Sequence, residues 1–138
     1  MAATPANRRF TALPETECLS RLRSHSIGRV GWVSAEGPQI LPLTYAVRDG
    51  VIFFRTTPYG ALSELRTSQP VAFEVDEFDL ATRTGWSVLV RGTAAAATDA
   101  DQLAALWQEQ DPIPWATGAR TLFIAIRPEH VSGRVISG

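Results

Sequence analysis

Residues Pro42–Leu65, PLTYAVRDGVIFFRTTPYGALSEL, decide how this chain is interpreted. Asp49-Gly50 lies between two runs rich in β-branched and aromatic residues, and this pair supplies the positive φ angles of a two-residue hairpin turn. Pro58 suits the first position of a helix, because a proline lacks the N–H that would have no partner there. The stretch therefore predicts a strand, a tight turn, a second strand and then a helix over about 58–66.

The junction after the second strand is the best candidate for a ligand site. Arg55, Thr56 and Thr57 come directly before the expected helix, whose first backbone amides, at Tyr59, Gly60 and Ala61, would have no partner within the helix. An arginine beside free amides at a helix start attracts anions. We therefore expect this junction to bind an anionic group.

Composition narrows the classes of function. Of the 138 residues 45% are hydrophobic, which is enough for one core, so we expect a flexible terminus over 1–9 and a single domain over 10–138. The 13 basic and 14 acidic residues nearly cancel, which argues against a nucleic-acid partner. All 13 basic residues are arginine, so a phosphate would be held without lysine. No signal peptide or membrane span is evident, and we expect a cytoplasmic protein without a membrane partner.

The single cysteine and the acidic residues give little support to nucleophilic catalysis or to metal binding. Cys18 is the only cysteine and belongs to the apolar side of a short helix expected after Pro14, so a buried thiol is favoured over a nucleophile. An acidic run, Glu74 to Asp79, raises the question of a metal site, but neither histidine has a ligand-like spacing to it. We interpret the run as a solvated strand end and expect no metal.

The remaining pattern is mainly β. Strands are expected over 27–33, 39–47, 71–75, 85–92, 121–127 and 131–136, and a helix over about 98–111 begins at Thr98 and Asp101. Pro42 interrupts its strand, which suits either an edge or a ladder that opens toward a ligand. We expect a small antiparallel split β-barrel of about seven strands, flanked by three short helices.

The order of these pieces resembles the pyridoxamine 5'-phosphate oxidase-like family of flavin-binding split barrels. The resemblance covers about residues 13–136 and is carried by the PLTY strand, the DG turn, the FFRT strand end, the GWSVLVRG strand and the closing PWA, IRP and SGR pieces. It implies a homodimer with a cofactor between the subunits, either FMN or 8-hydroxy-5-deazaflavin. It also implies hydride transfer to or from a small organic substrate, with no identified catalytic acid or base.

The resemblance also implies which residues bind the cofactor. Arg55 and Thr56 match positions that bind the cofactor phosphate. The hydroxyl of Thr57 and the backbone amides of Gly60 and Ala61 are further donors that we expect at the phosphate from the residue chemistry. Pro42, Leu43, Thr44 and Tyr45 match the strand along the ring system, and Trp86 and Ser87 match positions offered by the partner subunit. Each has an alternative: Trp86 could pack in the core or the dimer, Tyr45 could be a barrel residue with a satisfied hydroxyl, and Arg55 could form a surface salt bridge.

Two departures from the family pattern limit the functional interpretation. Many relatives carry lysine or arginine where this chain has Ala61, and the Arg-x-His element of true pyridoxamine phosphate oxidases is replaced by SGRVISG. Pyridoxamine phosphate is therefore not the expected substrate. The alternatives to an oxidoreductase are a non-catalytic protein that binds a flavin- or haem-type ligand, and a member that has lost cofactor binding.

Overall fold

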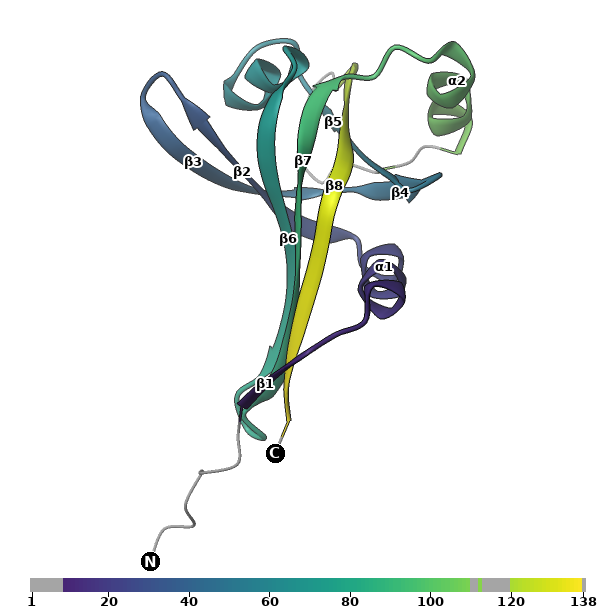
Figure 1. Cartoon of the computed structure of the whole chain (residues 1–138). Helices are drawn as coiled ribbons and strands as arrows, with labels where there is room; N and C mark the ends of the chain where they lie inside the picture. Colours follow the sequence, from purple (N-terminus) through teal and green to yellow (C-terminus); the bar gives the residue numbers. More distant parts are fainter. Residues whose placement is uncertain (1–8, 110–111, 113–119, 138) are drawn as a thin grey trace, which may run out of the picture.

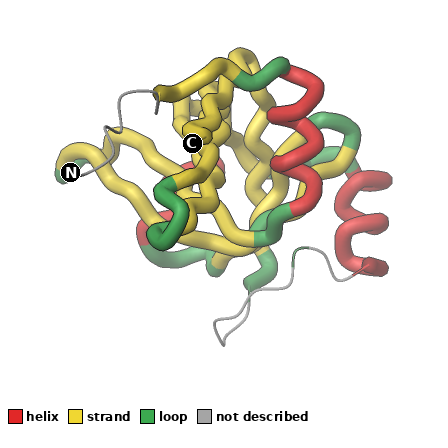
Figure 2. Tube along the Cα trace, turned by 90° about the horizontal axis from the view of Figure 1, so that it is seen from below, coloured by secondary structure: helices red, strands yellow, loops and turns green. Residues whose placement is uncertain are grey.

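The structure, a computed structural model, describes residues 9–109, 112 and 120–137. Eight strands in this part of the chain form one antiparallel sheet with the order β3-β2-β6-β7-β8-β5-β4, and β1 pairs with the far end of β8. The sheet curls around an interior without joining β3 to β4 (Figures 1 and 2). The predicted mainly β split barrel with three short helices is confirmed. The elements are β1 Arg9–Ala12, α1 Glu15–Ser24, β2 Ile27–Ser34, β3 Gly37–Thr44, β4 Ala46–Arg48, β5 Val51–Thr56, the 3₁₀ helix η1 Ala61–Arg66, β6 Gln69–Asp79, β7 Thr84–Ala96, α2 Ala100–Glu109 and β8 Leu122–Ser137.

The hairpin predicted from Asp49-Gly50 is present. Asp49 has φ 52° and Gly50 has φ 75°, and Arg48 pairs with Val51 across the turn. Two successive positive φ angles give the turn the twist that the flanking strands need. The strand before it is divided in two, because β3 ends at Thr44 and β4 begins at Ala46.

The two closing strands expected at the C-terminal end are one strand of 16 residues, β8. Its register with β7 changes at one place, where Arg91 pairs with His130 and Gly92 pairs with Pro128. Glu129 is the extra residue of this β-bulge. The bulge allows the strand to pass Pro128, whose missing N–H would otherwise break the ladder.

The interior of the curled sheet holds the main core. Phe54, Phe73 and Ile124 are fully buried there, and α1 adds Cys18 and Leu22 at one side. The predicted buried thiol is confirmed, and burial raises the pKa of Cys18. None of the helices in the described residues has the length and apolar content needed to cross a bilayer.

The two faces of the sheet differ in how they are covered. A second cluster, with Phe53, Phe123 and Leu106, lies where α2 packs on the outer face of β5 and the first part of β8. Elsewhere the outer face is open: Val33 on β2 is 75% exposed and Ile40 on β3 is 72% exposed. Because α2 covers only one end, the rest of the outer face is open and carries exposed apolar side chains beside charged ones.

Candidate functional site

Arg55 lies near the end of β5 and is half-buried under α2. Its Nε donates a hydrogen bond to the carbonyl of Arg120 at 3.1 Å, and its guanidinium carbon is 4.3 Å from the centroid of the Trp107 ring. The two terminal nitrogens of Arg55 make no hydrogen bond to another described residue. The side chain is thus held in place through one nitrogen, while its two other nitrogens remain able to donate to an anion.

Trp107 is a site neighbour that the sequence did not identify. It lies on α2, is 44% exposed and meets the Phe123 ring edge-on at 5.1 Å. It falls within the helix expected over about 98–111, and no sequence signal connects it to an arginine 52 positions earlier. The contact arises because β5 and β8 are paired and α2 packs across both.

The threonines and the helix start differ from the prediction. Thr56 is only 3% exposed and its side chain lies on the interior face, opposite to Arg55. The expected helix over 58–66 is a shorter 3₁₀ helix that begins at Ala61. Gly60, with φ 106°, prevents an earlier start, and Thr57 Oγ1 donates to the carbonyl of Tyr59. The expected free amides at Tyr59 and Gly60 therefore precede the helix.

The strand expected along the ring system has two distinct faces. Pro42 is exposed on β3, which is an edge strand, while Leu43 faces the core and Thr44 pairs with Ile27. The edge explanation for Pro42 fits this position, since β3 pairs only with β2.

Tyr45 is a core residue. It is 4% exposed, its hydroxyl donates to the carbonyl of Leu22 at 2.6 Å, and its ring meets the edge of Phe73 at 4.8 Å. Burial raises the pKa of the Tyr45 hydroxyl. These contacts match the alternative of a barrel residue with a satisfied hydroxyl.

Trp86 and Ser87 lie at the other end of the long strands. Trp86 pairs with Val135 of β8, whereas Arg55 pairs with Phe123, 12 positions earlier on the same strand. At about 3.3 Å per residue this is up to about 40 Å along the strand. Figure 1 shows β5 and α2 at one end of the sheet and the start of β7 at the other. A single chain does not bring these two groups of residues together.

Trp86 is buried in the main core beside α1 of its own chain, which matches the alternative of core packing. Its ring is 4.8 Å from the His25 ring and 4.7 Å from the guanidinium carbon of Arg21, and it borders a cavity of about 360 Å³. The side chain of Ser87 lies on the outer face, between Asp76 and Arg134 in the register.

The acidic run on β6 is tied to neighbouring cations. Arg29 on β2 is 3.3 Å from the Glu74 carboxylate and 3.5 Å from that of Asp76, and His25 is 3.2 Å from Glu77. Burial, with the neighbouring Asp76, raises the pKa of Glu74 to about 7. Among the described residues no three His, Cys, Asp or Glu side chains are placed to hold a metal ion.

A groove of about 780 Å³, which the sequence did not predict, crosses the outer face of the sheet. None of the residues predicted to bind a cofactor lines it. Its residues come from five strands and from Ser68, just before β6, and its sequence signal is a pair of small residues, Gly31 and Ala72.

The comparisons with known proteins agree with this architecture. The family model for pyridoxamine 5'-phosphate oxidase matches residues 14–135. An uncharacterized protein of Mycobacterium tuberculosis is 34% identical over 137 residues, which span 96% of this chain and 89% of that protein.

Two solved structures have the same fold. An FAD-binding protein of Mycobacterium smegmatis superposes with a TM-score of 0.75 at 29% identity, over 91% of this chain and 98% of that one. An FAD-binding protein of Mesorhizobium loti gives a TM-score of 0.75 at 26% identity, over 96% and 100%. Together with the family match over most of its length, these likenesses show that the chain belongs to the pyridoxamine 5'-phosphate oxidase-like family.

Proposed function

We propose that the protein is a cytoplasmic flavin-dependent oxidoreductase, a homodimer that binds one cofactor in each of two clefts between its subunits. FMN is the proposed cofactor, and 8-hydroxy-5-deazaflavin is the alternative. The substrate is a small organic molecule that accepts or gives a hydride. Pyridoxamine phosphate is not proposed, because the C-terminal sequence SGRVISG lacks the expected Arg-x-His element.

The environment of Arg55 is the observation that carries this proposal. The Arg55 guanidinium is oriented by the Arg120 carbonyl and by the Trp107 ring, with two terminal nitrogens left for a ligand. Such a pair of parallel N–H groups suits a phosphate oxygen pair. The chain contains no lysine, so Arg55 is the cation placed for this role at the β5 end. The FAD-binding proteins with the same fold support a flavin as the molecule that carries the phosphate.

The position of Ser87, on the outer face and far from Arg55 along the strands, supports a second subunit in the site. If both ends of the long strands contribute to one cleft, the distance along β8 requires that they come from different chains. The open outer face, with exposed Val33 and Ile40, offers an apolar surface for that contact. Two copies related by a two-fold axis would form two identical clefts.

The bound flavin would supply the hydride chemistry, and the residues of this chain would bind it, orient it and exclude water. Arg55 would hold the phosphate, and Trp107 would keep the guanidinium in position from its outer side. Binding and orienting the flavin in this way requires no catalytic acid or base.

Absorption spectroscopy tests the proposal directly. Purified protein is examined for a bound flavin, then stripped of ligand and titrated with FMN, FAD and 8-hydroxy-5-deazaflavin. We expect saturable binding of one of them and bleaching of the flavin band by dithionite. Absence of binding for all three would refute the proposal.

Ala61 favours a second candidate, a member of the family that has lost its cofactor. Ala61 is exposed at the start of η1 and gives no charge where many relatives have one. An Ala61→Lys variant separates the two possibilities: we expect it to bind FMN several-fold more tightly than the native protein. A native protein that binds nothing, together with an Ala61→Lys variant that binds FMN, would support the second candidate.

A further inference from the structure

Arg134 lies on the outer face of the sheet, directly beside Ser87. The register pairs Arg134 of β8 with Ser87 of β7, and Ser87 in turn pairs with Asp76 of β6. Paired residues of neighbouring strands share one face and lie about 5 Å apart. Trp86 and Val135, the adjacent residues of the two strands, pack in the core, so Arg134 and Ser87 face outward. A group that contacts Ser87 is therefore within reach of the long Arg134 side chain.

The Arg134 guanidinium is held by an aromatic ring and not by a hydrogen bond. Its central carbon is 4.1 Å from the centroid of the Phe10 ring, which β1 brings to the end of β8. Arg134 forms no hydrogen bond or ion pair with another residue in 9–109, 112 or 120–137. Arg55 is similar, since its guanidinium lies at the Trp107 ring and keeps two terminal nitrogens. Both arginines are thus oriented by a ring and can donate to an acceptor.

The nearest carboxylate in this row already has a cation. Asp76 lies two strands from Arg134, or about 10 Å, and Arg29 of β2 is 3.5 Å from the Asp76 carboxylate. Arg29 also lies 3.3 Å from Glu74. The row therefore presents a paired carboxylate, the hydroxyl of Ser87 and the unpaired guanidinium of Arg134.

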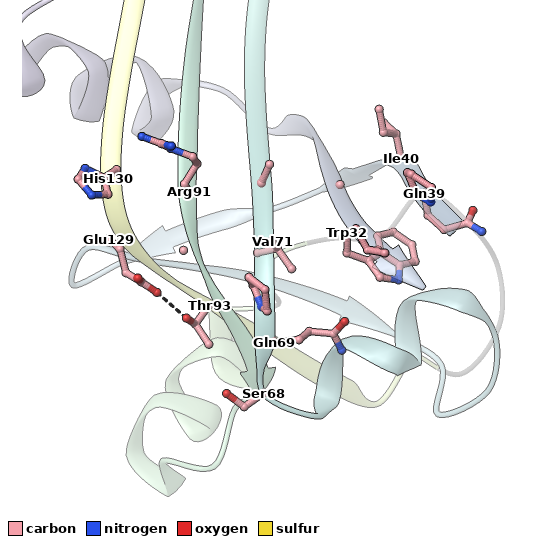
Figure 3. A pocket seen from close by; sticks show the side chains of 16 residues that line it. Trp32, Gln39, Ile40, Ser68, Gln69, Val71, Arg91, Thr93, Glu129 and His130 are labelled. Atoms are coloured by element: carbon pink, nitrogen blue, oxygen red, sulfur yellow. Dashed lines mark hydrogen bonds between the residues drawn. The ribbon is translucent and has the colours of Figure 1, made fainter. Parts of the chain in front are cut away.

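A second subunit would bring this row to Arg55. Within one chain, Arg134 is 11 positions along β8 from Phe123, which pairs with Arg55, and this is up to about 36 Å. The groove of about 780 Å³ lies between these two ends of β8, and a second chain that joins them would cover it (Figure 3). A cleft that contains Arg55 of one subunit and Ser87 of the other therefore also contains Arg134 of that other subunit.

Arg134 would give this cleft a charge that does not come from the start of η1. Ala61 is neutral at the position where many relatives carry lysine or arginine, and the chain has no lysine. A guanidinium from the other subunit can supply paired N–H donors to the same bound molecule.

We propose that Arg134 is a cofactor-binding residue that acts across the subunit interface. Its guanidinium donates hydrogen bonds to an acceptor group of the flavin that is bound at Arg55 of the partner subunit. The acceptor is either the phosphate or the carbonyl edge of the ring, since both suit paired N–H donors. Phe10 positions the guanidinium. This inference rests on the proposed function, because it requires both the flavin and the dimer.

Titration of the full-length protein with FMN and with riboflavin tests this role. Arg134→Ala should bind FMN about tenfold more weakly than the native protein or worse, because charge-assisted hydrogen bonds are lost. Arg134→Lys should recover part of the loss. Arg23→Ala removes the same charge from an exposed position on α1 and should bind as the native protein does. A loss for FMN alone assigns the phosphate, and an equal loss for FMN and riboflavin assigns the ring.

Mixed dimers of Arg134→Ala and Arg55→Ala test whether the residue acts across the interface. Both defects then fall in one cleft, and the other cleft is native, so we expect one tight FMN site per mixed dimer. If Arg134 served a cleft with Arg55 of its own chain, each cleft would carry one defect and no site would return. Thermal unfolding and light scattering check that each variant is a folded dimer.

Three results would overturn this inference and leave the proposed function standing, provided that Arg55→Ala still weakens FMN binding. They are a folded Arg134→Ala dimer with native affinity for both ligands, mixed dimers without a restored site, and an Arg134→Ala protein that is folded but monomeric. The last would show that Arg134 joins the subunits and not the cofactor. A native protein that binds no flavin would refute the proposed function as well.

Discussion

At Arg55, one side chain has both a structural and a proposed binding role. In Arg55→Ala the hydrogen bond to Arg120 and the charge for the phosphate are both lost. We expect FMN affinity to fall by about 1.5–3 kcal/mol, the range for a hydrogen bond to a charged group. Fluorescence titration measures the change, with Arg23→Ala as the matched control. An Arg55→Ala variant that is folded and binds FMN as tightly as the control would remove Arg55 from the site.

The sequence singled out Arg55 from its neighbours in the chain, and its role at a cofactor phosphate stays a prediction. A strand end followed by Pro58 and Gly60 suggested an anion site without knowledge of the tertiary structure. Trp107 could not be predicted in this way, because its contact with Arg55 depends on how α2 packs across β5 and β8. Thr56 follows Arg55 directly, yet strand alternation turns its side chain into the interior.

The β-bulge in β7 and β8 depends on Gly92. A Cβ at this position would lie 2.2 Å from the carbonyl oxygen of Arg127, which is backbone and cannot move away as a side chain can. Gly92→Ala should therefore destabilise the protein by about 1–3 kcal/mol, the usual cost of forced backbone shifts. Gly31→Ala is the control, since its Cβ meets nothing within 3.5 Å. Urea unfolding compares them, and equal midpoints would contradict this account of the bulge.

The carboxyl groups of Glu74 and Asp76, which lie on β6 beside Arg29 of β2, make the free energy of unfolding depend on pH. Burial raises the folded-state pKa of Glu74 from 4.5 to about 7, so the folded protein binds more protons than the unfolded chain between these values. Stability should therefore decrease as pH rises through this window, by at most about 1.4 kcal/mol per pH unit for one proton. Glu74→Gln should flatten this slope.

The control for that experiment is Glu36→Gln, in an exposed turn. Unfolding midpoints measured between pH 4.5 and 8 should show the same slope for this control and the native protein. A Glu74→Gln slope equal to the native slope would show that this carboxyl does not titrate as described.

The sequence predicted correctly those secondary-structure elements that are determined by residues within the element itself. The Asp49-Gly50 turn and α1 were both predicted, since the determining residues lie within each element. The joining of 121–127 and 131–136 into β8 was not predicted, because Pro128 reads as a break unless the bulge opposite Gly92 is known. The strand β1 was also missed, since four residues give no clear alternation and form only by pairing with β8.

At the scale of the whole molecule, it was the resemblance to the family that divided the expected cleft between two chains, since the residue pattern alone suggested only an anion site at Arg55. Nothing in the order of residues shows that Arg55 lies beside the start of β8, whereas Ser87 lies beside its end. The register shows this separation, and it makes the proposed dimer a geometric requirement of any cleft that uses both residues.

Mixing two defective variants tests that requirement. Arg55→Ala removes the proposed phosphate contact, and Ser87→Trp places a bulky ring on the outer face at the other end of the strands. Each homodimer should bind FMN poorly, since both of its clefts carry the defect. In a mixed dimer both substitutions fall in one cleft, so the other cleft is native. We therefore expect mixed dimers, formed by unfolding and refolding the two variants together, to regain one tight FMN site per dimer. Native mass spectrometry counts the bound cofactor, and light scattering confirms the dimer. Mixed dimers without a restored site, or a monomer that binds FMN, would show that the cleft lies within one chain.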